Sequence, residues 1–119
     1  MSSRAKPVPN AKRREGIFLI PDMKEFFVYI LTNTSKTVLY TGITSDLEKR
    51  LNEHKAGDKG ESAFTSRYGV KYLLHYERFQ RATDAIAREK EIKGWRREKK
   101  VKLIESENPY WKFLNEEEI

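Results

Sequence analysis

The sequence predicts one small α+β domain in which a three-stranded, mainly antiparallel sheet is flanked by helices. Three observations lead to this prediction: three short runs rich in β-branched and aromatic residues, three stretches typical of helices, and a length of 119 residues, which is enough for a single core. The order along the chain is strand, strand, helix, strand, helix, helix, with no internal repeat.

The first two strands are expected to form a hairpin. Residues 24–32, KEFFVYILT, and residues 37–44, TVLYTGIT, flank the polar segment NTSK. Thr34-Ser35 is a poor two-residue turn, so we expect a longer loop. Centring the turn on residues 34–37 places Tyr29 and Tyr40 on the same sheet face, at or near opposition.

The first helix is expected next, from a capping box to a glycine stop. Ser45 with Glu48 three residues on makes the box, and residues 55–57 end the helix. A glycine- and charge-rich loop over residues 57–69 then leads to a third strand at residues 71–79, KYLLHYERF.

Two further helices follow the third strand. Thr83 can cap a helix over residues 83–95, and Gly94 weakens the end of that helix. The helical pattern resumes at residues 96–106, and Asn108-Pro109 ends it.

The chain ends are expected to differ from the domain between them. Residues 1–24 are predicted to be a basic, flexible arm, residues 25–115 the domain and residues 116–119 an acidic tail. Apolar side chains near the C-terminus are expected to pack back on the core; they are Trp111, Phe113 and Leu114.

Composition excludes several classes of protein. The absence of cysteine excludes a disulfide scaffold, a thiolate zinc site and a cysteine nucleophile, and agrees with the reducing cytoplasm, where we expect the protein to act. No apolar run approaches the roughly 20 residues that span a bilayer, and no apolar signal segment is visible, so no membrane partner is expected. With 24 Lys and Arg against 18 Asp and Glu, the net charge of +6 favours a polyanionic partner such as nucleic acid.

Four residues around the first helix have two interpretations. Tyr29 and Tyr40 could be a cross-strand aromatic pair that closes a core, or they could line a site. Arg50 and His54 stand four residues apart and therefore share one stripe of the helix. Arg50 could simply pair with a carboxylate at helical spacing, Asp46 or Glu53, an interaction worth only a few tenths of a kcal/mol.

Glu89 gives the strongest signal in the residues themselves. At about 100° per residue, Ala82, Ala85, Ile86 and Ile92 fall within an arc of roughly 120°, and Glu89 lies near its centre. A carboxylate there is costly unless it is paired, binds a metal or faces an open cleft. A buried pair with an arginine is the structural alternative to a functional site.

Basic residues gather after Glu89. Between Arg88 and Lys102, eight of 15 residues are Lys or Arg and three are Glu. Such a run is usually a solvated helix face, but here it includes Trp95 and could contact phosphate groups. The residues predicted to bind nucleic acid are Lys49, Lys93, Arg96, Arg97, Lys99 and Lys100.

Taken together, these residues resemble the GIY-YIG endonuclease superfamily, and most closely its small stand-alone bacterial members of uncharacterised function, over about residues 25–115. The first tyrosine motif of that family matches Phe27-Val28-Tyr29, and the second matches Tyr40-Thr41-Gly42. The family arginine and its histidine match Arg50 and His54. The metal-binding glutamate matches Glu89 in AIAREKEIKGW.

The resemblance implies the GIY-YIG fold and a metal-dependent endonuclease that hydrolyses phosphodiester bonds in DNA in repair or recombination, with branched or flapped DNA as the expected substrates. It implies one divalent ion, Mg²⁺ or Mn²⁺, and no small-molecule cofactor. Tyr29 would activate the attacking water, and Tyr40 would hold that water or the phosphate. Arg50 would neutralise charge on the phosphoryl oxygens, and Glu89 would bind the ion. His54 is counted with these catalytic residues.

The chain departs from the family pattern at three places. Phe27 replaces the first glycine of the family name, Thr41 replaces its second isoleucine, and no asparagine follows Glu89 within its helix, Asn108 being much further along. Two other functions stay open: a nucleic-acid-binding module that keeps the fold without turnover, with DNA favoured over RNA, and an adaptor whose basic helix meets an acidic protein.

Overall fold

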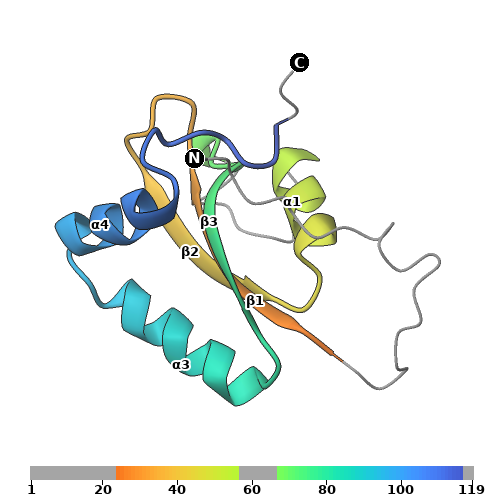
Figure 1. Cartoon of the computed structure of the whole chain (residues 1–119). Helices are drawn as coiled ribbons and strands as arrows, with labels where there is room; N and C mark the ends of the chain where they lie inside the picture. Colours follow the sequence, from red (N-terminus) through yellow and green to blue (C-terminus); the bar gives the residue numbers. More distant parts are fainter. Residues whose placement is uncertain (1–23, 57–66, 117–119) are drawn as a thin grey trace.

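The computed structural model describes residues 24–56 and 67–116 and shows a three-stranded antiparallel sheet with helices on both faces (Figure 1). The expected arm before Lys24, residues 57–66 of the long loop and the tail beyond Glu116 lie outside the described residues. No helix in the described part of the chain is long and apolar enough to cross a membrane. The elements are β1 (Phe26–Thr32), β2 (Leu39–Thr44), α1 (Leu47–Ala56), β3 (Tyr72–Phe79), α3 (Ala82–Lys93) and α4 (Arg97–Glu107). The predicted α+β class and order of elements are confirmed.

The sheet has the strand order β2-β1-β3, and both pairs of neighbours are antiparallel. In the hairpin, Tyr29 faces Gly42 and Leu31 faces Tyr40. Because residues that face each other in an antiparallel pair point to the same side, Tyr29 and Tyr40 are diagonal neighbours on one sheet face. The expected common face of the two tyrosines is confirmed.

The hairpin turn is the longer loop that the sequence predicts, and Asn33 organises it. The side-chain oxygen of Asn33 accepts hydrogen bonds from the backbone N–H groups of Thr37 at 2.9 Å and Val38 at 3.1 Å. The backbone N–H of Lys36 bonds to the Asn33 carbonyl at 3.0 Å, and Lys36 takes a left-handed φ of 60°.

A β-bulge interrupts the pairing of β1 with β3. Ile30 faces His75, but Leu31 faces Leu73, so Leu74 has no opposite residue. Leu74 and His75 consequently both lie on the face that carries Ile30. This shift places a histidine where strict alternation would have left an apolar residue.

The core has two parts, one on each face of the sheet, because β1 is buried on both sides. Figure 1 shows α1 on one face and α3 with α4 on the other. The α1 side contains Phe27, Tyr29, Leu31, Leu47, Leu51, Val70, Leu73 and Tyr76. The side of α3 and α4 contains Val28, Ile30, Leu74, Ala85, Ile92 and Ile104. Alternate residues of the central strand therefore serve different cores.

The predicted cap of α1 is wrong by one residue. Asp46, and not Ser45, caps the helix: its Oδ1 accepts the backbone N–H of Lys49 at 3.1 Å, and its carbonyl accepts that of Arg50 at 3.1 Å. The reason lies in Thr44, whose hydroxyl oxygen accepts the Asp46 N–H at 3.0 Å and turns the chain before the helix begins.

The predicted cap of α3 is also wrong. The helix already begins at Ala82, with Arg81 at the N-cap position and no capping side chain, because the Arg81 carbonyl accepts the first helical bond, from Ala85 at 3.2 Å. Thr83 is therefore inside the first turn. At the other end Gly94 does stop the helix, and its N–H bonds to the carbonyls of the preceding turn.

The C-terminal segment is fastened to the sheet by Asn108, which ends α4 as predicted. Its Nδ2 donates to the carbonyls of Leu74 and Lys112, both at 3.0 Å, and its Oδ1 accepts the Lys112 N–H at 2.9 Å. The expected packing of the C-terminal aromatic and aliphatic side chains is confirmed for Trp111, Phe113 and Leu114.

The same segment then runs along the outer edge of β3. The backbone N–H of Leu114 donates to the Leu73 carbonyl at 2.8 Å. The side chain of Asn115 accepts the Leu73 N–H at 2.9 Å and donates to the Lys71 carbonyl at 3.0 Å. Backbone groups at the start of this edge strand are thereby satisfied within the chain.

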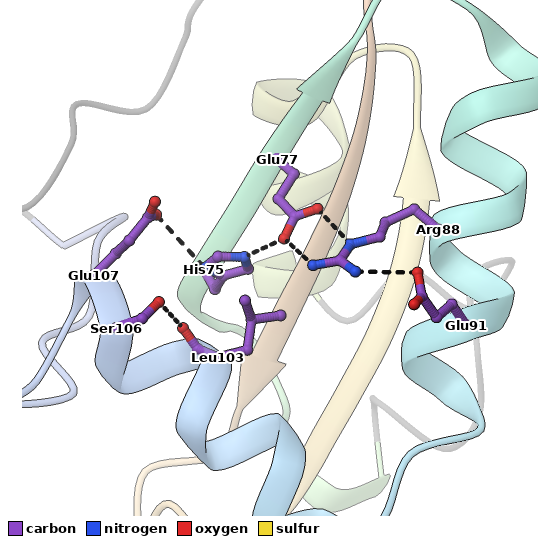
Figure 2. A network of polar contacts seen from close by, with 7 residues as sticks. All are labelled: His75, Glu77, Arg88, Glu91, Leu103, Ser106 and Glu107. Carbon is purple, nitrogen blue, oxygen red and sulfur yellow. Dashed lines mark hydrogen bonds and ion pairs between the residues drawn. The ribbon is translucent and has the colours of Figure 1, made fainter.

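A partly buried polar network ties α3 and α4 to β3 (Figure 2). Arg88 donates through Nε and Nη2 to the two carboxylate oxygens of Glu77, at 2.8 and 3.1 Å, and through Nη1 to Glu91 at 3.0 Å. On the other side, His75 Nε2 donates to Glu77 at 2.8 Å, and its Nδ1 lies 3.8 Å from Glu107. α3 thus binds the Glu77 carboxylate directly, whereas α4 reaches it only through His75.

The network sets the ionisation of its central carboxyl group. Burial alone would raise the pKa of Glu77, but hydrogen bonds from His75 and Arg88 and the charge of both partners outweigh it and lower the pKa from 4.5 to about 2. The hydrogen bond with Glu77 is also the main reason why the pKa of Arg88 is raised above its ordinary value. The carboxylate is thus ionised at every physiological pH.

This predicts how stability depends on pH. Because the pKa of Glu77 is lower in the folded chain, its stabilisation is complete above about 4.5 and is lost as the pH falls toward 2. We expect Glu77→Gln to lower the free energy of unfolding by up to about 3 kcal/mol at pH 7, and by much less near pH 2. Urea unfolding followed by circular dichroism at several pH values measures this. Glu91→Gln, which removes a half-exposed carboxylate from the same guanidinium, is the control and should have a small effect at all pH values.

Candidate active site

Two tyrosines and a histidine meet on the sheet face that α1 covers. The Tyr29 hydroxyl lies 3.3 Å from His54 Nε2, and both side chains are buried. The His54 ring also meets both phenol rings edge to face, with centroids 6.0 Å from Tyr29 and 5.8 Å from Tyr40. The structure therefore joins three of the predicted catalytic residues in one cluster, with His54 between the tyrosines.

Gly42 makes room for this cluster. A Cβ atom at this position would lie 2.5 Å from both Cζ and Oη of Tyr29, far inside van der Waals contact. The Tyr29 ring therefore lies directly over the Gly42 backbone, and its hydroxyl can reach His54 only because residue 42 has no side chain. Packing against Tyr29 thus explains why the second tyrosine motif has a glycine at this position.

Arg50 lies one helical turn before His54 on α1, which carries it to the same side of the sheet. Its Nε is 3.2 Å from Glu53 Oε1, and both side chains are about one-third exposed. The structure thus contains the helical ion pair that was the alternative interpretation of Arg50. An exposed pair of this kind is weak, so a phosphate could replace Glu53.

Glu89 belongs to α3, on the opposite face of the sheet. Its side chain is only 14% exposed, and Oε2 lies 2.7 Å from the ammonium group of Lys93. The partner is therefore a lysine one turn on, and not the arginine that was considered. Ala85 and Ile92 are buried as expected, but Ile86 is 43% exposed.

The apolar stripe of α3 is consequently narrower than predicted, since Ala82 is exposed as well. The helix needs only Ala85 and Ile92 to cover the sheet. Glu89 thus lies at the border of the buried stripe, where its lysine partner can still reach solvent.

The predicted catalytic residues therefore form two groups. His54 contacts both Tyr29 and Tyr40 and lies on the same helix as Arg50, whereas Glu89 lies in the helix layer on the other face of the sheet. The edge strand β2 has its Tyr40 side chain on the α1 face and its Thr41 side chain toward α3, since successive residues point to opposite faces.

A divalent ion fits this arrangement only with Glu89 as its protein ligand among the described residues. Within residues 24–56 and 67–116, no three His, Asp or Glu side chains lie close enough together to hold a metal ion. Glu89 supplies a carboxylate, the hard oxygen ligand that Mg²⁺ prefers, and Mg²⁺ commonly keeps several waters and binds through one or two carboxylates plus substrate phosphates. The donor set fits such a site with one protein ligand.

The residues predicted to bind nucleic acid fall into different environments. Arg97 donates to the carbonyls of Thr37 at 3.1 Å and Lys36 at 3.2 Å, so it joins α4 to the hairpin turn. The Lys99 ammonium lies 4.6 Å from the centre of the Trp95 ring. Arg97 thus has a structural task, whereas Lys99 lies on the solvent side of an aromatic ring.

The other four predicted contacts are distributed over three helix ends. Arg96 is exposed at the N-cap of α4, and Lys100 is half-buried in its first turn. Lys93 neutralises Glu89, and Lys49 is 71% exposed on α1 at 3.8 Å from Glu53. Arg96, Lys99 and Lys49 are the most accessible to a phosphate group.

One structural feature, the polar network around Glu77, was missed from the sequence. The network of His75, Glu77 and Arg88 depends on the bulge in β3, and only the spacing of His75 and Glu77 on one strand face could have suggested it. Asn108, a candidate for the family asparagine by type alone, is buried and bonded to backbone groups of Leu74 and Lys112. Its role is to end α4.

Comparison with known proteins agrees with this fold. The family described as "GIY-YIG catalytic domain" matches residues 25–102. A UPF0213 protein of Haloquadratum walsbyi is 40% identical over 83 residues, covering 70% of this chain and 91% of that protein. A UPF0213 protein of Syntrophus aciditrophicus is 42% identical over 87 residues, covering 73% and 97%.

A solved structure is also similar. The solution NMR structure of a UPF0213 protein from Bacillus halodurans is 27% identical in sequence, with a TM-score of 0.49, over 76% of this chain and 94% of that one. On the family match and the relatives together, the chain belongs to the GIY-YIG family and is similar to its UPF0213 proteins. The resemblance seen in the sequence is confirmed.

The contact of Tyr29 with Gly42 predicts a strong response to one methyl group. Gly42→Ala should lower the free energy of unfolding by about 1–3 kcal/mol, because the new Cβ displaces the Tyr29 ring. Urea unfolding measures the loss, and the Tyr29 ring NMR signals should shift with it. Gly94→Ala is the matched control: its Cβ would meet its nearest neighbour at 3.6 Å, an ordinary contact. Equal effects of the two substitutions would contradict the proposed contact.

Proposed function

We propose that the protein is a metal-dependent endonuclease that hydrolyses phosphodiester bonds in DNA. The observation that carries the proposal is the buried pair of Tyr29 and His54, which gives a phenol hydroxyl a proton acceptor at 3.3 Å. Membership of the GIY-YIG family supports it. The resemblance extends the proposal to branched or flapped DNA in repair or recombination, and the lack of cysteine supports a cytoplasmic location.

Tyr29 needs His54 in order to act as a base. An ordinary tyrosine has a pKa near 10 and keeps its proton at neutral pH. With Nε2 of His54 unprotonated, the Tyr29 hydroxyl donates to it. As a water attacks phosphorus and the bond from phosphorus to the leaving oxygen breaks, the proton of the water passes to the Tyr29 oxygen while Tyr29 gives its own proton to His54, and the leaving oxygen takes a proton from solvent. Gly42 contributes by letting the ring lie in place.

Arg50 and Tyr40 act on the phosphate. The planar guanidinium of Arg50 can exchange Glu53 for two phosphoryl oxygens and stabilise the negative charge that develops on them. Tyr40 packs against His54 and holds the water or the phosphate beside Tyr29. Both side chains thus orient groups that Tyr29 has to reach.

Glu89 would hold the divalent ion, Mg²⁺ or Mn²⁺, together with water and phosphate oxygens. When bound, the ion supplies a Lewis acid next to the leaving oxygen. Lys93 occupies Glu89 Oε2 in this structure and is 53% exposed, so its ammonium can turn into solvent. When no ion is bound, the ammonium group of Lys93 thus neutralises the negative charge of Glu89.

A cleavage assay tests the proposal. Labelled single-stranded, duplex, flapped and four-way DNA are incubated with Mg²⁺, with Mn²⁺ and with EDTA. We expect metal-dependent cutting by the unaltered protein, and its loss by about 100-fold or more in Tyr29→Phe and in Glu89→Gln.

Glu91→Gln is the control for Glu89→Gln, because it changes an exposed carboxylate two residues along the same helix. It should cut like the unaltered protein. Cutting that survives in Glu89→Gln, or in EDTA, would show that the proposed enzyme is wrong.

A nucleic-acid-binding module without turnover is the second candidate. The observation that favours it is the short Glu89–Lys93 ion pair, which neutralises the carboxylate by a contact within its own helix. In that case the accessible basic residues of α4 carry the function. An adaptor for an acidic protein would instead show no salt-dependent affinity for nucleic acid.

Binding measured against salt concentration separates these functions. Arg96→Ala combined with Lys99→Ala should weaken binding to duplex DNA and lower the slope of log K against log salt by about 1 for each phosphate contact that is lost. Fluorescence anisotropy measures both quantities. Lys55→Ala is the control, because Lys55 lies at the end of α1 and pairs with Glu116 at 3.9 Å. Equal slopes for the two variants would show that α4 is not part of the DNA-binding surface.

A further inference from the structure

The residue before Glu89 is the one that fastens α3 to the sheet. Arg88 makes a two-pronged ion pair with Glu77, and its guanidinium lies 5.2 Å from the centre of the Trp95 ring (Figure 2). The Glu77 carboxylate also accepts a hydrogen bond from His75 Nε2 at 2.8 Å. The direction of the Arg88 side chain is therefore fixed by groups on both of its sides.

The direction of Glu89 follows from this contact through helical geometry. Ala85 and Ile92 mark the buried line of α3. At about 100° per residue, Arg88 lies roughly 50° to one side of that line and Glu89 roughly 50° to the other. Arg88 reaches toward β3, which is one edge of the sheet, so Glu89 faces toward β2, the opposite edge.

Apolar packing alone fixes this rotation weakly. The buried stripe of α3 consists of one alanine and one isoleucine, and the N-terminal end of the helix has no capping side chain. A helix that packs through so narrow a stripe can rotate about its own axis, a motion called roll below. A roll of about 10° moves a carboxylate at the helix surface by about 1 Å, and a misplacement of 1 Å can cost a catalytic site about 100-fold.

We propose that the ion pair of Arg88 with Glu77 sets the roll of α3 and thereby positions Glu89 toward β2, the strand of Tyr40. The proposal rests on the proposed function for the role of Glu89, but the roll itself is a property of the fold. Arg88 and Glu77 are positioning residues: they bind no reacting group and act through Glu89.

Two measurements on Arg88→Gln, Arg88→Lys and Glu77→Gln test the proposal. The first is the pattern of NMR nuclear Overhauser effects from the Ala85 and Ile92 methyl groups to Val28, Ile30 and Leu74, which reports the roll without metal or DNA. The second is the Mg²⁺-dependent cleavage of DNA, resolved into kcat and KM. Ile104→Val, a core change in α4, is the control for simple loss of stability.

We expect Arg88→Gln to change the methyl pattern and to lower kcat by about 10- to 100-fold, with KM for DNA nearly unchanged. Arg88→Lys keeps the charge but not the two-pronged geometry, so it should lie between Arg88→Gln and the unaltered protein. Combining Glu77→Gln with Arg88→Gln should cost no more than the larger single effect, because the two side chains act as one unit. Ile104→Val should change neither the roll nor kcat.

An unchanged methyl pattern in Arg88→Gln overturns the proposal, whatever happens to cleavage. A changed pattern with unchanged kcat overturns the link to Glu89. If the pattern changes but the unaltered protein cuts no DNA, the ion pair does set the roll and it is the proposed nuclease function that fails.

Discussion

The structure depends on the double burial of β1. This strand is paired on both edges and covered on both faces, so each of its side chains must fit one of two separate cores. Tyr29 obeys this constraint as a core residue, and its hydroxyl is then left among apolar groups unless a polar partner is supplied. His54 supplies that partner from α1, and Gly42 supplies the space. The arrangement of the candidate site thus follows from the need to bury Tyr29 in the central strand.

The two halves of the site differ in physical character. The tyrosine and histidine side is buried and held together by ring contacts. The Glu89 side is an ion pair with an exposed lysine, which is easily exchanged. A cation that approaches Glu89 competes with Lys93 for the same oxygen. The candidate site thus combines a rigid aromatic part with an exchangeable ion pair.

The sequence predicted the fold well where a single local signal decided the outcome. Alternating strands, the long hairpin turn and the end of α4 at Asn108 were all correct, because turn chemistry and periodicity act over a few residues. The helix caps at Ser45 and Thr83 were misplaced: the Thr44 hydroxyl turns the chain so that α1 begins one residue later, after Asp46, and the Arg81 carbonyl lets α3 begin earlier, at Ala82. The spacing of His75 and Glu77 shows only that they share a face; the bulge at Leu74 decides that this is the face of α3 and Arg88, so the network itself could not be predicted. The common face of Tyr29 and Tyr40 followed from the turn, whereas the contact with His54 required the full packing of α1.

The C-terminal segment has a consequence for how the protein behaves among copies of itself. Sheet edges invite pairing with another chain, and β3 is an edge strand. Leu114 and Asn115 occupy backbone groups at the start of that edge, so the last described residues work as a built-in cover against strand addition. A chain cut after Glu107 would keep every strand and helix but would lose this cover together with Asn108. Such a shortened domain should tend to self-associate through its sheet, and the few residues beyond α4 therefore serve colloidal stability as much as folding.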